Sequence, residues 1–165
     1  MAANLSNNPI AKVAYSVAKG VRKNRAVIRY VCKVEDIYAR RTDDYAFERT
    51  IWILDPEPVA AWLVANGSNQ AGDMVMYIPS LSLLYTRKPL ATDPVVKIGT
   101  ETKTLEELRP WDNTTGGMDV ASDIIEWAGV SYRIAKIEPT HWWKNDPAKF
   151  KVTLRAGPGV KWRGY

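Results

Sequence analysis

Few residues of this chain could perform acid–base or nucleophilic chemistry, and they are scattered. His141 is the only histidine and Cys32 the only cysteine among 165 residues. A Ser-His-Asp or Cys-His arrangement would therefore have to be built on His141 and a distant partner. His141 precedes Trp142 and Trp143, which favours a packed or exposed loop residue over a catalytic base. We expect no catalytic residues and predict that the protein is not an enzyme.

Neighbouring carboxylates could in principle bind a hard cation. None of the pairs places a ligand at every second residue, the spacing of a calcium loop. One cysteine cannot form a zinc cluster or an internal disulfide, and no Gly-rich phosphate loop is present. We interpret these carboxylates as solvated surface charges, Cys32 as a buried free thiol, and expect no metal or other cofactor. The pairs are Asp43 with Asp44, Glu106 with Glu107, and Asp119 with Asp123.

A one-sided basic segment is the clearest binding signal. The net charge is +5, and residues 1–50 hold ten basic and five acidic side chains, whereas residues 51–165 hold thirteen of each. Residues 12–33 carry seven Lys and Arg and no acid. Such a segment could neutralise phosphates without reading sequence, although an ordinary solvated face is the alternative. The candidates for contact with DNA are Arg22, Lys23, Arg25, Arg40 and Arg41.

Aromatic residues are abundant, with seven tryptophans and eight tyrosines. We expect Trp52, Trp62 and Trp127 to pack in the hydrophobic core. The aromatics of loops and of the C-terminal tail cannot all be buried in one small core, and Tyr and Trp are favoured anchors of protein interfaces. The candidates for docking to other subunits or partners are Trp111, Trp142, Trp143, Trp162 and Tyr165.

The elements that position these residues are mostly short strands. Asn8-Pro9 can start a helix, which we predict over residues 9–19 with Gly20 as its exit. Its apolar face would consist of Ile10, Val13, Ala14, Val17 and Val21. Alternation and apolar runs predict strands over 26–34, 47–54, 74–78, 95–98, 123–127, 130–137 and 149–155.

Turn and loop signals separate these strands. Ala128-Gly129 predicts a tight hairpin turn, and Thr104 with Glu107 a capping box. Residues 35–46 read as a loop or a long hairpin tip, and residues 59–64 as one helical turn. We predict a mainly β fold: one small β-barrel or sandwich domain of about six to seven strands, residues 1–155, with a short N-terminal helix, long loops and a flexible arm at 156–165. No signal peptide or membrane-spanning run is evident, so we expect a cytoplasmic site of synthesis and no membrane contact.

Several short motifs occur together in one order. They are Ala71-Gly72-Asp73 before the strand that ends at Pro79, Asp123-Ile124-Ile125 with Gly129 in a hairpin, the run 132–139 from Tyr132 to Pro139, and the run 150–155 from Phe150 to Arg155. In this order the chain resembles the head-closure, or stopper, proteins of tailed bacteriophages, which connect head to tail. The resemblance covers residues 71–155. The chain departs from the family pattern in a longer stretch between Ile98 and Asp123 and in an aromatic, basic tail.

The resemblance implies a virion protein of the phage neck, assembled in the host cytoplasm. Members of this family form a ring, here expected to be a hexamer or dodecamer, between the portal and adaptor proteins and the tail proteins. The ring retains packaged double-stranded DNA. A loop between early strands narrows the channel, and residues 35–46 with Arg40 and Arg41 at the tip would take this place.

Three other functions are compatible with parts of the sequence. A tail terminator or another neck ring protein would differ only in the partners of each face. A free nucleic-acid-binding module of small-barrel type would gather stacking aromatics and a basic groove on one face. A hydrolase would have to be built on Asp119, Asp123 and His141, and is the least favoured.

Overall fold

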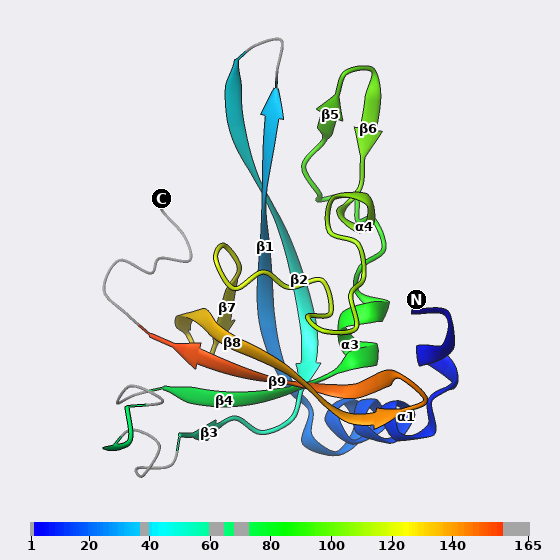
Figure 1. The fold of residues 1–165 in the computed structure, drawn as a ribbon, viewed down its shortest axis with the longest axis vertical. Coiled ribbons are helices and arrows are strands. Elements are labelled where there is room, and N and C mark those ends of the chain that lie inside the picture. The colour runs from blue at the N-terminus through cyan, green and yellow to red at the C-terminus, as the bar shows by residue number, and fades with distance from the viewer. Residues whose placement is uncertain (1, 37–39, 60–64, 68–72, 157–165) are drawn as a thin grey trace.

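The chain folds into a mainly β structure, as the sequence predicts. The computed structural model describes residues 2–36, 40–59, 65–67 and 73–156 (Figure 1). A separate two-stranded ladder pairs β5 (Val96–Ile98) with β6 (Glu101–Lys103). The main antiparallel sheet contains β1 (Asn24–Asp36), β2 (Arg41–Ile53), β3 (Glu57–Pro58), β4 (Met74–Pro79), β7 (Ile124–Trp127), β8 (Val130–Trp143) and β9 (Asp146–Arg155).

The main sheet curls into a small barrel. Its strand order is β2-β1-β7-β8-β9-β4-β3, and the two outer strands are consecutive in the chain. Immediately after β2, the N–H of Leu54 donates to the carbonyl of Tyr77 in β4 at 3.0 Å, and β3 then pairs with β4. The continuation of β2 therefore meets the opposite edge of the sheet, which leaves the barrel with few open edges.

The barrel interior is built from alternate residues of its strands, as the sequence patterns predict. In β9 the buried side chains are Phe150, Val152 and Leu154. In β1 they are Ala26, Ile28, Tyr30, Cys32 and Val34, so the interpretation of Cys32 as a buried thiol is confirmed. Burial of each large apolar side chain contributes about 2 kcal/mol, which makes this cluster the main source of stability.

The N-terminal helix has the predicted start but a different end. η1 (Ala2–Asn7) leads into α1 (Pro9–Ser16), where the Asn8 side chain accepts hydrogen bonds from the amides of Ile10 and Ala11. The helix continues as the π-helical segment η2 (Val17–Arg22), and Lys23 ends it with a left-handed φ of 56°. The prediction that Gly20 ends the helix is therefore wrong, because the exit conformation falls on Lys23.

The prediction of the buried helix face is wrong in part. The helix buries Ala11, Ala14 and Ala18, whereas Val13 and Val21 are 63% and 71% exposed. Ala11 packs in a small cluster with Leu5, Leu81 of α3 (Ser80–Tyr85) and Ala148 of β9. Small side chains permit this close approach, so the packing favours the alanine face over the larger valines.

Hairpins are longer than the sequence indicates. The predicted loop 35–46 is mostly strand, since the β1–β2 ladder extends to the pair Asp36–Arg41. His141, Trp142 and Trp143 lie on the end of β8 instead of in a loop, and Lys144 and Asn145 turn into β9 with positive φ. The chain there keeps pairing with β9 up to Trp143–Asp146.

Two local predictions are confirmed, and two lie outside the described residues. Ala128 and Gly129 form the β7–β8 turn with φ of 52° and 79°, and Thr104 caps α4 (Leu105–Leu108) through the Glu107 amide. The predicted turn 59–64 with Trp62 and the predicted arm 156–165 fall almost entirely on residues that are not described. Among the described residues, no helix has the length and apolar character needed to cross a membrane.

Candidate functional site: the projecting arm and its anchor

The β1–β2 hairpin projects beyond the barrel. Both strands are 13 residues long, but β1 pairs with β7 only over Val27–Arg29. Beyond Val31 the hairpin continues as a two-stranded arm, which we define as residues 32–36 and 40–45 (Figure 1). At about 3.3 Å per residue, the arm reaches about 17 Å past Val31. A hairpin of this length presents its tip far from the barrel core.

The arm tip is basic, and one of its two arginines is locally neutralised. Arg41 Nε lies 3.0 Å from Asp43 Oδ2, with both side chains more than a third exposed. Arg40 is exposed and has a left-handed φ of 53°. No carboxylate of the described residues forms an ion pair with Arg40, which leaves its charge available to a partner.

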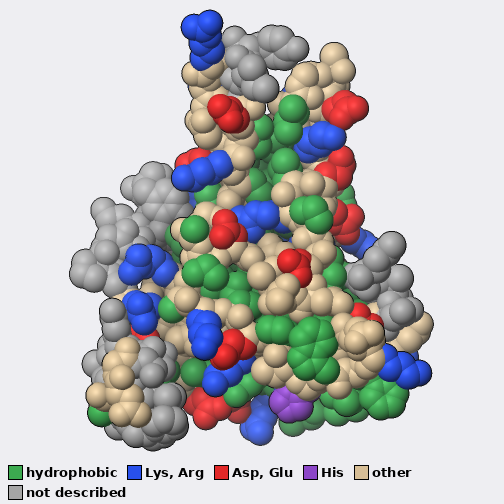
Figure 2. Space-filling view, viewed as in Figure 1, with side chains coloured by type: hydrophobic (Ala, Val, Ile, Leu, Met, Phe, Trp, Pro, Cys, Tyr) green, Lys and Arg blue, Asp and Glu red, His purple; other side chains and the backbone are tan. Residues whose placement is uncertain are grey.

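A cleft separates the arm from the β5–β6 hairpin. The two hairpins rise side by side in Figure 1, and Figure 2 shows hydrophobic side chains in the space between them. The cleft measures about 420 Å³. Its apolar lining comes from Val34, Tyr45 and Val95. Its charged lining consists of the Arg41–Asp43 pair and Lys97. A second hairpin therefore stands beside the arm across this cleft.

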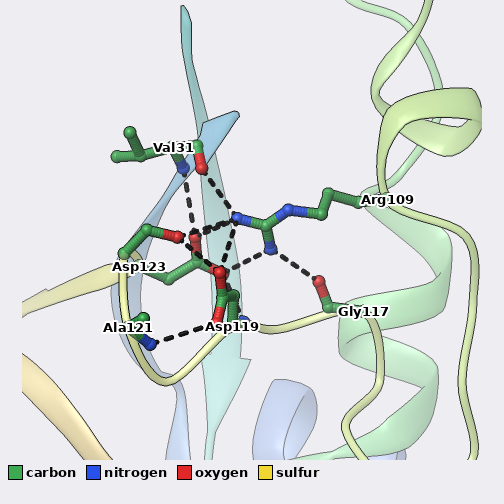
Figure 3. A network of polar contacts seen from close by, with 7 residues as sticks. Val31, Arg109, Gly117, Asp119, Ala121 and Asp123 are labelled. Atoms are coloured by element: carbon green, nitrogen blue, oxygen red, sulfur yellow. Dashed lines mark hydrogen bonds and ion pairs between the residues drawn. The ribbon is translucent and has the colours of Figure 1, made fainter. Parts of the chain in front are cut away.

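A buried ion pair anchors the arm just before β7 begins (Figure 3). Asp123 Oδ1 accepts the Val31 N–H at 3.1 Å, and Arg109 Nη2 donates to the Val31 carbonyl at 2.8 Å. Arg109 and Asp123 bind each other through two contacts of 2.7 and 2.9 Å. Side chains of the pair therefore satisfy the backbone N–H and C=O of Val31 in β1, next to the first residue of β7.

The anchor is also tied to the irregular stretch that the sequence left without structure. Arg109 Nη1 donates to the Gly117 carbonyl at 3.0 Å, and the Asp119 N–H donates to Asp123 Oδ2 at 2.8 Å. Residues 109–123 thus fold back on the base of the arm. The irregular stretch between Ile98 and Asp123 therefore includes the segment that holds the arm in place.

Burial governs the electrostatics of this anchor. The Asp123 side chain is fully buried, so its interpretation as a solvated surface charge is wrong. Burial raises the pKa of Asp123, and hydrogen bonds from Arg109 and from the backbone amides oppose that rise. Burial lowers the pKa of Arg109, but the hydrogen bond and charge of Asp123 outweigh it, so the net shift is upward. Neither group can lose its partner without leaving an unpaired buried charge.

The other predicted DNA-facing residues lie at the opposite end of β1. Arg22 forms an ion pair with Asp55 at 3.1 Å, Lys23 is exposed at the helix exit, and Arg25 lies over the Trp52 ring at 5.5 Å. Eleven strand residues separate Arg25 from the arm tip, or about 35 Å. The five predicted basic residues therefore form two separate groups.

The predicted docking aromatics differ in exposure and lie in different parts of the chain. Trp142 and Trp143 are 49% and 42% exposed on the β8–β9 hairpin, beside the exposed His141. Trp111 is partly buried, packs edge-on against Phe150 at 5.9 Å and donates to Asn113. Trp162 and Tyr165 lie outside the described residues.

Ion pairs between distant segments were missed by sequence reasoning. Asp73 and Arg155, which belong to the first and last motifs of the resemblance, bind each other through contacts of 3.0 and 2.9 Å. Arg49 is 2% exposed and held by Asp93 through contacts of 2.6 and 2.7 Å. The signal for Arg49 was present, because it alternates with the inward-facing Phe47 and Ile51, where a charge requires a buried partner.

Comparisons with known proteins assign this chain to no family, so its description rests on its fold and its arm. No protein-family model, curated protein or solved structure matches the chain. Within the described ranges, no three His, Cys, Asp or Glu side chains are grouped to hold a metal ion.

Proposed function

We propose that this protein is a structural component of the neck of a tailed bacteriophage, a head-closure protein whose copies form a ring. The ring would join the portal and adaptor proteins to the tail and retain packaged DNA. The observation that carries the proposal is the arm: a two-stranded extension of a small barrel that ends in Arg40 and Arg41. The resemblance leads us to expect a channel-narrowing loop at residues 35–46, and the arm would fill this role.

In a ring, the small positive charge of each arm tip would be repeated around one axis. Each copy contributes Arg40, which no described carboxylate neutralises, and the Arg41–Asp43 pair. Several such tips at one constriction would add up to a collar of positive potential. Contacts of this kind bind phosphates without reading base sequence, which suits the retention of any packaged genome.

The anchor gives the arm the stiffness that a constriction needs. Arg109 and Asp123 fix both backbone groups of Val31, and the β5–β6 hairpin stands beside the arm. The exposed Trp142 and Trp143, at the β8–β9 hairpin, would bind a neighbouring neck protein, since interface anchors are enriched in tryptophan. The arm and the aromatic hairpin are separate surfaces, as a connector between two partners requires.

The test is replacement of the gene in the phage that encodes it by an Arg40→Glu/Arg41→Glu variant. We expect purified particles to contain the variant protein in the neck but to lose packaged DNA. A Lys88→Glu/Lys136→Glu variant, with the same change of charge on exposed residues outside the arm, should retain DNA. The readouts are mass spectrometry of purified particles and the fraction of DNA-filled heads in electron micrographs.

Two results would contradict the proposal. The first is absence of the unaltered protein from purified particles. The second is tight, salt-sensitive binding of single-stranded DNA by the isolated chain together with full DNA retention by the arm variant, which would indicate a free nucleic-acid-binding module.

A further inference from the structure

Both edges of the arm carry open backbone groups. β1 pairs with β7 only as far as Arg29, and β2 is the last strand of the main sheet. Within the part of the chain that the structure describes, no further strand pairs with either of them along the arm, because the β5–β6 hairpin forms a ladder of its own. Such edges are templates for pairing with another chain unless something covers them.

The contacts of Val31 show which groups of β1 point outward. In an antiparallel strand, the N–H and C=O of one residue point to the same side, and those of the next residue point to the other side. The N–H and C=O of Val31 both bind the Asp123–Arg109 anchor, on the β7 side of β1. Lys33 and Glu35, two and four residues further along, therefore direct their N–H and C=O to this same side, which is open along the arm.

The outer edge of β2 is open at the same level. Val31 pairs with Ala46, so the N–H and C=O of Ala46 point away from β1. The N–H of Trp52, six residues further along β2, agrees with this assignment, because it donates to a serine hydroxyl of α3 and not to β1. By the same alternation, the N–H and C=O of Thr42 and Asp44 point outward, where the described residues offer them no backbone partner.

The two open edges are complementary. In the β1–β2 ladder Lys33 is level with Asp44, and Glu35 is level with Thr42; all four side chains are exposed. Because β1 and β2 run in opposite directions, two arms side by side with their tips at the same end place the β1 edge of one against the β2 edge of the next as an antiparallel pair. Lys33 of one copy is then a direct or diagonal neighbour of Asp44 in the next copy, and opposite charges in these positions stabilise the pair.

A second copy of this chain is the partner that satisfies both edges. A foreign strand would cover one edge of the arm and leave the other open. Identical arms around an axis cover every edge, because each arm gives its β1 edge to one neighbour and its β2 edge to the other. A two-fold pairing of like edges would stop at two copies and leave half of the edges uncovered.

We propose that the arms of neighbouring copies pair edge to edge, β1 against β2, into a closed antiparallel sheet around the channel. The inference rests on the proposed function, because it names a subunit contact of that ring. Each contact is short, so it would form where the portal and adaptor proteins hold the copies side by side at high effective concentration. The pairing would also hold the Arg40 tips at one level.

The β5–β6 hairpin leaves this contact free and orients the sheet. The hairpin faces Val34 and Tyr45 across the cleft. Side chains of consecutive strand residues lie on opposite faces, so this is the face of the arm that does not carry Lys33 and Asp44. In a closed ring of arms the hairpins have room only on the outside, and the face with Lys33 and Asp44 would therefore line the channel.

Proline substitution tests the edge contact in the assembled neck. Glu35→Pro removes an N–H that points outward and does not join β1 to β2, so the arm itself should stay paired. The full chain is bound to portal–adaptor complexes, and native mass spectrometry and titration give the copies per complex and their affinity. Glu35→Pro should weaken ring formation by about tenfold or more relative to Glu35→Ala, which keeps the N–H. Circular dichroism confirms that each variant is folded.

Disulfide trapping on the same complexes reads the pairing directly. Lys33→Cys chains are mixed under oxidising conditions with chains that carry a cysteine at one outward position of β2, while Cys32 stays buried. The partner variants are Thr42→Cys, Asp44→Cys and Ala46→Cys. One of the three mixtures should give a crosslinked dimer and with it the register of the pairing. Lys33→Cys chains alone should give none, because like edges do not meet in the ring.

The outcomes separate the inference from the proposed function. If the unaltered chain forms a ring in which Glu35→Pro binds as tightly as Glu35→Ala, or in which no β2 position crosslinks to Lys33→Cys, the inference fails and the proposed function stands. A crosslink of Lys33→Cys to itself would show a two-fold pairing, which also overturns the inference. If the unaltered chain forms no ring with portal, adaptor or tail proteins, the proposed function fails and the inference fails with it.

Discussion

Arg49 and Arg109 are largely withdrawn from solvent and bind Asp93 and Asp123. The partly exposed Arg155 binds the buried Asp73. Removing a charge from water costs several kcal/mol, so each pair is stable only while both partners are present. Arg87 differs, because its guanidinium is 2% exposed and lies 6.0 Å from the centre of the Trp111 ring, and burial lowers its pKa. The contacts of these arginines fix the positions of loops relative to the strands of the barrel.

Removal of one anchor partner should be far more costly than removal of a surface pair. Arg109→Met leaves the carboxylate of Asp123 buried without its cation and should lower the free energy of unfolding by about 3–5 kcal/mol. Arg41→Met breaks the exposed pair with Asp43 and should cost less than about 1 kcal/mol. Urea unfolding followed by circular dichroism measures both. Equal costs for the two variants would mean that the anchor does not hold the arm.

Asp93 should make stability depend on pH. Burial opposes its ionisation, but hydrogen bonds from Arg49 and from the Leu90 amide outweigh this and lower its pKa below the ordinary 3.8. A carboxyl group with a depressed folded-state pKa stabilises the fold above its unfolded pKa, and this contribution is lost as the pH falls through the folded-state value.

The check is the difference in unfolding free energy between the unaltered protein and Asp93→Asn from pH 6 to about pH 2. The unaltered protein should be the more stable at pH 6, and the gap should narrow below about pH 4. A gap that stays constant or widens on acidification would contradict the assignment of the Arg49–Asp93 pair.

At the level of elements, the turns set where the hairpins end. The β7–β8 turn uses Ala128 and Gly129 and the β8–β9 turn uses Lys144 and Asn145, all with positive φ. Glycine marks only the first of these turns in the sequence. The sequence predicts a loop at the second turn, because lysine and asparagine indicate a left-handed backbone conformation less strongly than glycine does.

Gly117 should be less replaceable than Gly99, although both have positive φ. A Cβ at Gly99 meets nothing within 4 Å, whereas a Cβ at Gly117 would collide with the buried guanidinium of Arg87. The left-handed backbone alone costs an alanine about 1–2 kcal/mol at either position. Overpacking should add about 1–3 kcal/mol at Gly117 only.

Thermal or urea unfolding of Gly117→Ala and Gly99→Ala measures this difference, and each glycine serves as the control for the other. If Gly117→Ala were no more destabilising than Gly99→Ala, the 109–123 segment would be able to move away from Arg87 without cost.

In the whole molecule, one hydrophobic cluster runs from the barrel into the base of the arm. It includes Cys32 and Val34 together with Met76, Val96 and Leu154. Because these residues share one core, we expect the arm base and the barrel to unfold in a single transition.

The thiol of Cys32 reports on that cooperativity. It is 3% exposed, and burial raises its pKa, so a thiol reagent should label it only after unfolding. Labelling and far-UV circular dichroism should give coincident urea transitions, whereas a Val130→Cys variant should gain a thiol that is labelled in the native state. Labelling of Cys32 at urea concentrations where the barrel is still folded would show that the arm opens independently.

The sequence by itself determined the local structure. Alternation located β1 and β9 and their inward residues, Asn8 and Thr104 identified helix starts, and Ala128-Gly129 located a turn, because each signal depends on neighbours within a few residues. It also placed Arg40 and Arg41 in a segment that is either a loop or a long hairpin tip, the part of the candidate site that local pattern alone could predict.

The tertiary structure decided which surfaces meet. It buried the alanine face of α1, packed the partly buried Trp111 against Phe150, and paired Asp123 with Arg109 under the arm. None of these follows from local pattern, because a helix face, an aromatic ring or a charge is buried only if a distant segment packs against it. Long-range packing therefore buried an acidic residue of apparent surface type in the anchor and left Val13 and Val21 exposed.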